Sequence, residues 1–500
     1  MRHERDGREI GRAQADLGAA LMQQERLTEA IAAYAAAVAV NPGRAAEWLA
    51  EANYKMARVL RQRGDDAGAE AALREVIALR PDWPTAHVGL GMVLKDTGRL
   101  EEALRCHHEA VRLDPRSAAA WTTLGVALHA VDEFEAAEAA HRKAIALAPE
   151  AVEPCCNLGR LMHDLGRLDE ARALHEAAVA RAPDDGTARF NLATALLLDG
   201  DFARGFAEYE WRRRPGVLVP AVRSFAVPEW RGEPLHGRTL LLHAEQGLGD
   251  TLQFVRFVPV VAAHAARIVL EVQAPLAGLL ARSLPGVAVV AAGTPLPPHD
   301  CHLPLLSLPV RLGTTLDTLP AAVPYLRPAP DTVAAWRERL AARAGLKVGL
   351  VWAGNPKHRF DRRRSLPLAR LLPHLPAGGV ALHSLQKDLR PDDRAALAGR
   401  PDIVDLSGAL GDFSDTAAVV AALDLVVSVD SAVAHLSGAL AKPTLLLTPH
   451  ALDWRWLRDR ADSPWYPTMR LIRQSRAGDW SDVLVRLQEA LRAPADAAVV

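Results

Sequence analysis

The chain has 500 residues, half of them apolar and 24% charged, and its 59 basic and 60 acidic side chains leave a formal net charge of −1. A single hydrophobic core rarely extends beyond about 250 to 300 residues, so at least two domains are expected. The balanced charge excludes a long-range field that would draw the chain onto nucleic acid or an anionic membrane. We therefore expect no nucleic-acid partner.

Cysteine usage and hydropathy indicate in which cellular compartment the protein is expected. The four cysteines form no C-x-x-C pair and no Cys/His cluster, which argues against a zinc site and against a disulfide framework. The first ten residues lack the apolar core of a signal peptide. The most apolar stretch, 417–429, contains an aspartate and is shorter than the roughly 18 residues of a membrane span. We expect a cytoplasmic protein with no transmembrane helix.

A 34-residue period organises the first two fifths of the chain. A proline, a leucine followed by a small residue, and a later small residue recur at this spacing. Pro42 continues the register backwards across a five-residue insertion, so about six units are expected over 9–217. The recurring positions are Pro81, Pro115, Pro149 and Pro183; Leu90, Leu124, Leu158 and Leu192; and Ala103, Ala137, Ala171 and Gly205.

The unit that ends at Pro149 resembles the tetratricopeptide repeat in Trp121, Leu124, Gly125 and Ala137. The resemblance implies two antiparallel helices that approach closely at the small residues and end at proline, which lacks an N–H. Stacked pairs produce a solenoid with a concave groove. We expect this groove to recruit a protein or peptide; a spacer or a homodimerisation arm is the alternative.

The second half alternates apolar runs with amphipathic helices, which indicates parallel sheets and a chain of class α + α/β. Two such units follow each other, at 238–328 and 329–492, and a proline-rich stretch separates them. Ligands of such sheets bind beyond the carboxyl ends of the strands. Strands are predicted at 239–243, 267–272, 287–291, 347–352, 381–385, 423–429 and 443–447, and helices near 250–263, 274–283, 331–343 and 480–492.

A glycine loop follows the first predicted strand. Gly247 and Gly249 provide two glycines of a dinucleotide-binding fingerprint, but Leu252 stands where the third is required. Glu271, 22 residues after Gly249, matches the acid that binds a ribose. An NAD-dependent oxidoreductase is therefore kept as an alternative function.

A second motif opens a helix directly after the apolar run that ends at Val429. Asp430, Ser431 and Ala432 stand at the start of that helix, where exposed N–H groups and the helix dipole favour a diphosphate. His435, one turn further on, is a donor-site candidate. The alternative role of Asp430 is to cap the helix, and that of His435 is to pack against the sheet.

A third motif is the basic loop 352–365. Its Arg362, Arg363 and Arg364, with Asn355, are predicted to bind phosphate, because guanidinium groups match phosphate oxygens in pairs. A solvated surface run is the alternative.

These three motifs, in this order, resemble glycosyltransferase family 9, the ADP-heptose:lipopolysaccharide heptosyltransferases, over about 238–492. Residues 249–252 are similar to that family's G-D-x-L and residues 429–436 to its D-[ST]-x-x-x-H-L. The resemblance implies a GT-B fold of two Rossmann-like lobes facing a cleft. The resemblance gives Asp250 the role of catalytic base. It also implies that the segment beginning at Asp430 binds the donor diphosphate and that one of the three arginines contacts a phosphate.

Several of these roles have ordinary structural alternatives. Asp250 is equally suited to cap the following helix, which leaves His243 as the reserve base. The glutamate with which heptosyltransferases bind the donor ribose is replaced by the stretch 384–388, in which Lys387 is a donor-site candidate. Trp454 is a candidate to stack on the nucleotide base, or else packs in the core.

The leading hypothesis is a bacterial glycosyltransferase of hexosyl or heptosyl type that moves a sugar from a nucleotide-sugar to a protein recruited by the repeats. The α/β half of the sequence contains no D-x-D motif, so we expect neither a metal nor another cofactor. A lipopolysaccharide acceptor would need no solenoid, and the architecture is similar to that of the O-linked N-acetylglucosamine transferases of proteins. The alternative from another class is a non-catalytic interaction protein with a degenerate transferase domain.

Overall fold

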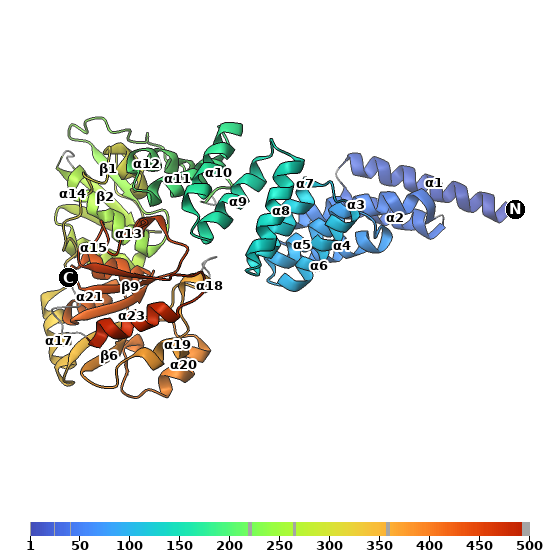
Figure 1. The fold of residues 1–500 in the computed structure, drawn as a ribbon. Coiled ribbons are helices and arrows are strands. Elements are labelled where there is room, and N and C mark those ends of the chain that lie inside the picture. The colour runs from blue at the N-terminus through green and yellow to red at the C-terminus, as the bar shows by residue number, and fades with distance from the viewer. Residues whose placement is uncertain are drawn as a thin grey trace. The chain divides into compact units, whose positions relative to one another are not determined.

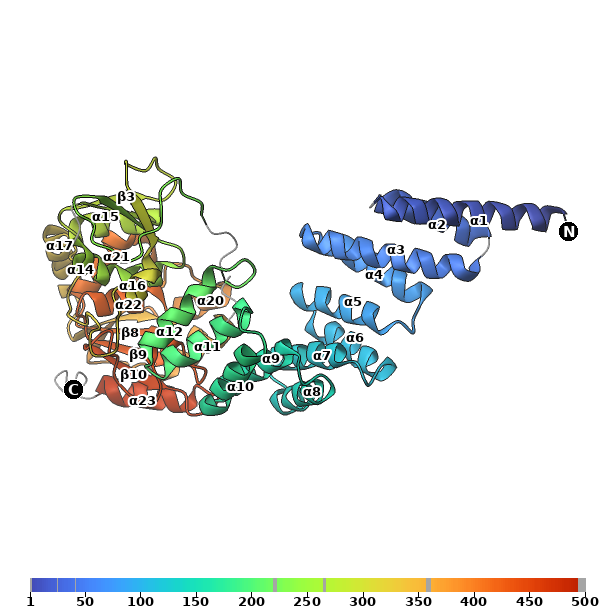
Figure 2. The same ribbon diagram turned by 90° about the horizontal axis from the view of Figure 1, so that it is seen from above.

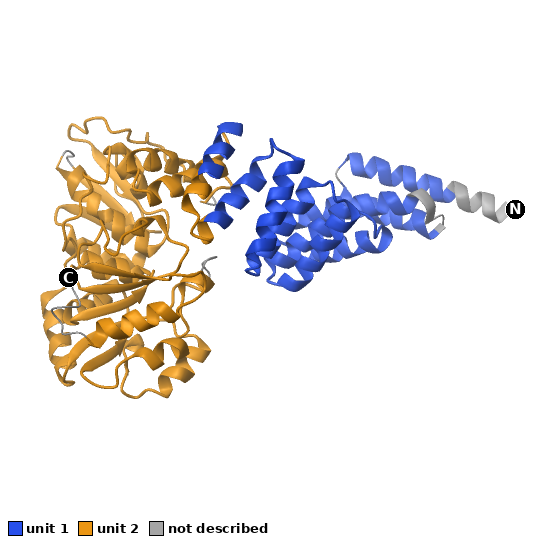
Figure 3. Ribbon diagram, viewed as in Figure 1, with its two compact units in different colours: residues 1–162, 173–183 blue, residues 163–172, 184–500 orange. Residues whose placement is uncertain are grey.

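The chain is helical up to Arg213 and alternates strands and helices from Thr239 onwards (Figure 1). It divides into two compact units, which are residues 1–162 with 173–183 and residues 163–172 with 184–500 (Figure 3). Among the described helices, none combines the length and hydropathy that crossing a bilayer requires. The computed structural model describes residues 2–24, 26–40, 42–218, 223–263, 267–356 and 361–492.

The described part of the helical region contains twelve α-helices in six antiparallel pairs, as the repeat predicted (Figure 2). Pro81 lies two residues beyond the end of α4, and the later repeated prolines stand in the same place after α6, α8 and α10, because a residue without an N–H does not continue a helix. The inserted residues lengthen α3 to 21 residues, against 13 in α5. The pairs are α1 Arg2–Gln23 and α2 Leu27–Val40; α3 Pro42–Gln62 and α4 Asp66–Leu79; α5 Pro84–Asp96 and α6 Leu100–Leu113; α7 Ala118–Ala130 and α8 Phe134–Leu147; α9 Val152–Asp164 and α10 Leu168–Arg181; and α11 Gly186–Leu198 and α12 Phe202–Tyr209.

A buried histidine faces a repeated glycine inside three of the pairs. A Cβ added at Gly91 would lie 2.7 Å from the ring of His107, so no larger residue fits without displacing the ring. Burial lowers the pKa of His107 to about 4 and leaves its imidazole neutral at pH 7. The sequence predicted the glycines but not their partners, although the histidines share the period. The equivalent pairs are Gly125 with His141 and Gly159 with His175.

The last helical pair carries the repeat pattern but belongs to the second unit (Figure 3). Phe202 and Phe206 of α12 are buried in the core of that unit, and the Phe206 ring lies 5.9 Å from the ring of Trp454. The predicted domain 9–217 therefore spans both units, because the apolar face of α12 packs on the α/β part.

Two all-parallel sheets form the rest of the second unit. The first has the order β3-β2-β1-β4 and the second the order β10-β9-β8-β5-β6-β7. Counted within its own sheet, the second order reads 6-5-4-1-2-3, the doubly wound arrangement, and the first is its four-stranded form. The strands are β1 Thr239–His243, β2 Arg267–Val272, β3 Val287–Ala291, β4 Cys301–Pro304, β5 Leu346–Val351, β6 Val380–Ser384, β7 Val404–Asp405, β8 Leu425–Val429, β9 Thr444–Thr448 and β10 Met469–Arg473.

The helices that connect these strands lie mostly where they were predicted, and the α + α/β class is confirmed; the assignment to GT-B stays a prediction. After the repeats, the short helix η1 (Glu210–Arg213) leads into this part. The other helices are α13 Leu248–Phe254, η2 Val255–Phe257, α14 Val258–Ala262, α15 Ala274–Ser283, η3 Leu305–Ser307, α16 Leu308–Arg311, α17 Pro330–Ala341, α18 Asp361–Arg364, α19 Leu368–Leu371, η4 Leu372–His374, α20 Pro391–Ala398, η5 Ser407–Ala409, α21 Phe413–Ala422, α22 Ala432–Ala439, η6 Trp454–Trp456 and α23 Ser481–Arg492.

Candidate functional site

All three sequence motifs lie where the strand order of a sheet reverses. In the first sheet this switch point lies between β1 and β4, and the glycine loop leaves β1 there. In the second sheet it lies between β5 and β8, which continue into the basic loop and into α22. Open parallel sheets bind ligands at such points, outside the carboxyl ends of the strands.

The first turn of α13 packs directly on the first turn of α22. A Cβ added at Gly249 would lie 2.8 Å from Cδ2 of His435 and 3.5 Å from Cα of Ala432. Gly249 therefore permits a close helix contact. This contact brings the glycine loop of the first sheet against the motif that follows β8.

Asp250 caps its own helix and also pairs with an arginine. Its Oδ2 accepts the Gly247 N–H at 2.8 Å, and its Oδ1 forms an ion pair with Arg455. Arg455 is buried, and it donates to Gln253 Oε1 at 2.9 Å and to Asp453 Oδ1 at 2.9 Å. The capping role named as an alternative is thus present, and both oxygens of Asp250 are engaged. Its role as a base stays a prediction.

Asp430 is held in a weakly acidic state at the start of α22. Burial and the neighbouring Asp453 carboxylate raise the pKa of Asp430 to about 6. Ser431 caps the helix, because its Oγ accepts a backbone N–H three residues further on at 3.4 Å. Ala432 is the first helical residue, so the predicted diphosphate segment coincides with a helix N-terminus.

His435 is a packing residue in this structure. Its buried ring lies 5.2 Å from the Trp456 ring at an interplanar angle of 20°, and its Nδ1 lies 3.0 Å from the Tyr466 hydroxyl. Burial lowers the pKa of His435 to about 3, so the ring is neutral. Its Nε2 lies 4.0 Å from Asp430 Oδ1, at the edge of the predicted donor site.

Arg364 lies at the carboxyl end of β5. A Cβ added at Gly354 would meet its Nη2 at 2.8 Å, and its buried Nε has no hydrogen-bond partner among the described residues. Ser365 fixes the loop, because its Oγ accepts the Gly354 N–H at 2.9 Å and donates to Asp361 Oδ1 at 2.7 Å. The positive charge of Arg364 acts to lower the pKa of Asp430, against the larger effect of burial.

The other candidates of the basic loop have different surroundings. Arg363 forms an ion pair with Asp164, and the side chains of Arg362 and Asn355 are exposed. Residues 357–360 of this predicted loop lie outside the described residues.

The stretch after β6 supports the basic loop. Gln386 is buried, and its Oε1 accepts the N–H groups of Trp352 and Ala353 at 3.3 and 3.1 Å. Lys387 is exposed, and its ammonium donates to the Gly411 carbonyl oxygen. The structure therefore gives this stretch a contact that positions the start of the basic loop.

His243, the reserve base, is enclosed. Its Nε2 lies 3.4 Å from His302 Nδ1, and the Phe225 ring lies 4.9 Å away. Burial lowers the pKa of His243 to about 3. Glu271, the acid considered for a dinucleotide ribose, is buried and already paired with Arg223.

Trp454 is a core side chain. It is 4% exposed, and its ring lies 5.8 Å from that of Tyr209 and 6.0 Å from that of Trp465. The structure thus places Trp454 in the packing role named as its alternative.

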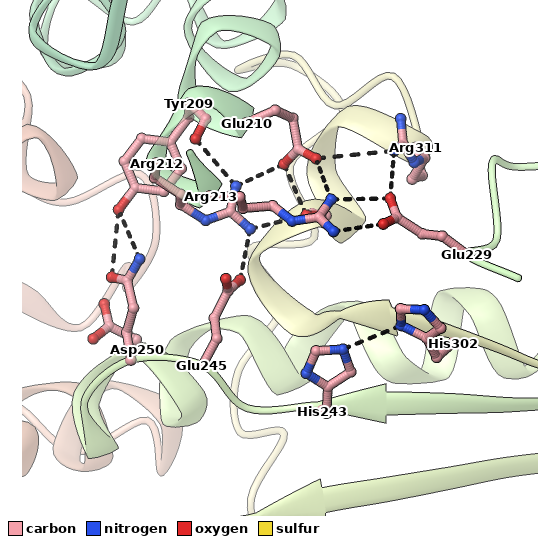
Figure 4. A network of polar contacts seen from close by, with 12 residues as sticks. Tyr209, Glu210, Arg212, Arg213, Glu229, His243, Glu245, Asp250, His302 and Arg311 are labelled. Atoms are coloured by element: carbon pink, nitrogen blue, oxygen red, sulfur yellow. Dashed lines mark hydrogen bonds and ion pairs between the residues drawn. The ribbon is translucent and has the colours of Figure 1, made fainter. Parts of the chain in front are cut away.

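Two buried arginines that the sequence did not single out organise this region. Arg455 joins Asp250 across 205 residues of sequence, and Arg212 joins Glu245 across 33. Arg212 belongs to a network of three arginines and three glutamates whose formal charges balance (Figure 4). Ion pairs between residues this far apart leave no local pattern in the sequence. The run of three arginines after Trp211 was the one visible sign of a charged cluster. The network consists of Arg212, Arg213, Arg311, Glu210, Glu229 and Glu245.

Comparisons with known proteins identify the helical part. The tetratricopeptide-repeat family matches residues 84–150, and a second form of it matches residues 15–55, 54–105 and 156–216. Among solved structures, a thermophilic TPR protein of Thermus thermophilus is 27% identical with a TM-score of 0.28, over 37% of this chain and 99% of that one. A tetratricopeptide repeat protein of Parabacteroides merdae is 16% identical with a TM-score of 0.36, over 41% and 79%.

A curated relative extends further along the chain. Protein FlbA of Caulobacter vibrioides is 30% identical in an alignment of 332 residues that covers 61% of this chain and 54% of FlbA. The chain thus spans about half the length of this relative. The matched share exceeds the part that ends at Val217, so the likeness includes some of the α/β part. Taken with the helix pairs, the family matches show that the N-terminal helical part consists of tetratricopeptide repeats.

Proposed function

We propose that this protein is a glycosyltransferase that binds a nucleotide-sugar at the switch point between β5 and β8 and transfers the sugar to a protein recruited by its repeats. One observation carries the proposal. The contact of Gly249 with Ala432 sets the loop of Asp250 against a helix N-terminus, and Arg364 lies at the same switch point as that helix. The resemblance to the heptosyltransferases supports the assignment of both motifs.

The donor diphosphate is held by Arg364 and the first turn of α22. A guanidinium offers paired donors to phosphate oxygens. The Nε of Arg364 has no hydrogen-bond partner among the described residues and lies 3.9 Å from Asp361 Oδ1. The exposed N–H groups of the helix start add a fixed positive field where charge develops on the leaving group. The raised pKa of Asp430 lets this acid take up a proton when the anion binds.

Asp250 accepts the proton of the acceptor hydroxyl in this proposal. A carboxylate whose two oxygens are both engaged is a poor base, so the ion pair with Arg455 must open first. A donor diphosphate beside Asp430 attracts Arg455, whose charge acts on Asp430 as well. Donor binding would then free Asp250, which makes donor-before-acceptor the expected order.

The repeats supply the acceptor-binding surface. A cavity of about 400 Å³ opens along α3 and the start of α5. Aromatic rings line it, with those of Tyr54 and Trp83 5.1 Å apart. Three basic and two acidic side chains complete the lining, which suits the apolar and polar side chains of an extended polypeptide. The lining residues are Glu47, Trp48, Glu51, Tyr54, Lys55, Arg58, Arg80 and Trp83.

A second candidate is a non-catalytic interaction protein that binds a nucleotide-sugar without transferring it. The observation that favours it is the engagement of both Asp250 oxygens by Gly247 and the buried Arg455.

Release of nucleoside diphosphate from a panel of nucleotide-sugars tests the proposal. We expect the wild-type protein to release it from one donor, and Asp250→Asn to be slower by a factor of at least about 100, because general-base catalysis contributes 10² to 10⁴. Asp415→Asn is the matched control, since Asp415 occupies the same capping-box position in α21 as Asp250 in α13. Equal background release by all three proteins from every donor would leave the non-catalytic candidate.

A further inference from the structure

One buried guanidinium ties the end of the helical repeats to the loop that leads into α13 (Figure 4). The side chain of Arg212 has no exposed surface, and its Nη2 donates to Glu245 Oε1 at 2.6 Å and to Ser307 Oγ at 2.8 Å. Its Nη1 donates to Glu210 Oε1 at 2.6 Å, and Ser307 Oγ donates to the same oxygen at 2.8 Å. Arg212 thus lies between one carboxylate of η1 and one carboxylate of the loop after β1.

Tyr209 supports the next residue of the same loop. Its hydroxyl lies 3.4 Å from Gln246 Oε1, and the Gln246 carbonyl oxygen accepts Gln273 Nε2 at 2.7 Å. Gln273 Oε1 in turn accepts the Thr251 hydroxyl of α13 at 2.9 Å. The two residues before Gly247 are therefore held by side chains from α12, from η1 and from the loop after β2.

These contacts determine where Asp250 points. Gly247 is the N-cap of α13, and its N–H donates to Asp250 Oδ2 at 2.8 Å. A displacement of Glu245 would move Gly247 along the chain and would break or redirect this hydrogen bond.

We propose that Arg212 is a positioning residue: from η1, directly after the last tetratricopeptide pair, it fixes the loop between β1 and α13 and so sets the direction of the Asp250 carboxylate. The structural part of this inference depends only on the contacts above, whereas its kinetic consequence rests on the proposed function. A buried ion-pair network is rarely the most stabilising way to fill such a space. A guanidinium, with five donors in a rigid plane, is well suited to fix the orientation of its partners.

The chain offers a matched control at the next residue. Arg213 is also partly buried and ion-paired, but its partners are Glu229 and Glu210. Its replacement removes a similar charge from the same network without removing a contact to Glu245.

Hydrogen–deuterium exchange of the amides at 244–252 in the full-length protein tests the structural part. We expect Arg212→Met to speed exchange there by about tenfold, the size expected for loss of a buried hydrogen bond, with Arg213→Met close to wild type and Arg212→Lys in between. Glu245→Gln keeps the shape of the side chain and should show the same local change if Arg212→Met does not fold. Equal exchange at 244–252 in Glu245→Gln and wild type, or equal acceleration by Arg212→Met and Arg213→Met, would overturn the inference.

Steady-state transfer kinetics test the consequence for Asp250. With an active donor, Arg212→Lys should lower kcat about tenfold and leave the donor KM unchanged, because Arg212 does not touch the predicted donor site. It should have no further effect on residual turnover in an Asp250→Asn background. Additive losses in the double variant would contradict a role through Asp250. Absence of transfer by the wild-type protein would refute the proposed function, while the exchange measurement would still decide the structural part.

Discussion

The tetratricopeptide repeats and the α/β part bury polar side chains in opposite ways. In the repeats, His107 and His141 are neutral, stand at equivalent positions and face a glycine. In η1 and the α/β part, Arg212 and Arg455 are charged, occur once each and are each held by one nearby acid and one acid from a distant segment. The first arrangement builds a uniform scaffold, and the second fixes individual groups at the switch points of the sheets.

Replacement of Arg455 should have the largest effect on stability. Arg455→Met leaves the partly buried carboxylates of Asp250 and Asp453 without their cation, which should cost up to roughly 3 to 5 kcal/mol in the free energy of unfolding. Chemical denaturation followed by circular dichroism measures it. The control is Arg460→Met, whose partner Asp462 is 63% exposed, and which should cost less than about 1 kcal/mol. Equal losses of unfolding free energy in the two variants would show that Arg455 does not form a buried ion pair in solution.

Acid should destabilise the repeats through their histidines. The pKa of His107 and that of His141 fall from 6.5 to about 4 on folding, so the unfolded chain binds the protons more readily. Their contribution to stability is complete above pH 6.5 and is lost as the pH falls towards 4, by up to about 1.4 kcal/mol per pH unit for each histidine. Urea midpoints between pH 7 and pH 4.5 measure this loss. The double variant His107→Phe with His141→Phe should have a flatter profile, and an unchanged slope would refute the assignment.

Replacement of a glycine in the repeats should have a smaller effect. Gly125→Ala gains about 1 kcal/mol of helix propensity but places a Cβ 2.5 Å from the His141 ring, and overpacking costs about 1 to 3 kcal/mol. We expect net destabilisation, relieved when His141→Ala is added. Gly378→Ala is the control, because a Cβ there meets nothing within 4 Å. A stabilised Gly125→Ala protein would show that the two helices approach less closely.

The smallest expected effect is a pH dependence of donor binding. Since an ionised Asp430 repels a diphosphate, affinity for a nucleotide-sugar should fall by less than about tenfold as the pH rises through about 6. Calorimetric titration in buffers of different ionisation enthalpy should detect the accompanying proton uptake. Asp430→Asn should abolish it; proton uptake that survives this substitution would assign it to another group.

The contrast between periodic contacts in the repeats and single, long-range contacts in the α/β part explains how much of the fold could be predicted from the sequence. The period revealed the helix pairs, and the apolar runs placed β1, β2 and β3 at the observed residues. Edge strands were missed: β4 contains His302 and a proline, and β10 has two arginines, so neither has the continuous apolar run of a strand buried on both faces.

The candidate site was predictable only in part. The resemblance to the heptosyltransferases predicted that Asp250 and the start of α22 serve one site, and the contact of Gly249 with Ala432 brings these two segments together. The engagement of Asp250 by Arg455 could not be predicted, because it depends on a pairing across 205 residues. The divergence of Arg363 and Arg364 also follows from tertiary contacts, with Asp164 and with the loop of Gly354.

Thermal shift with a panel of nucleotide-sugars tests the central claim, a donor site at the switch point between β5 and β8. We predict that one donor stabilises the wild-type protein and Arg362→Ala equally, because Arg362 is exposed, and that the shift is lost in Arg364→Ala. Stabilisation by a donor that is unchanged in Arg364→Ala, or no stabilisation of the wild-type protein by any donor, would contradict the account.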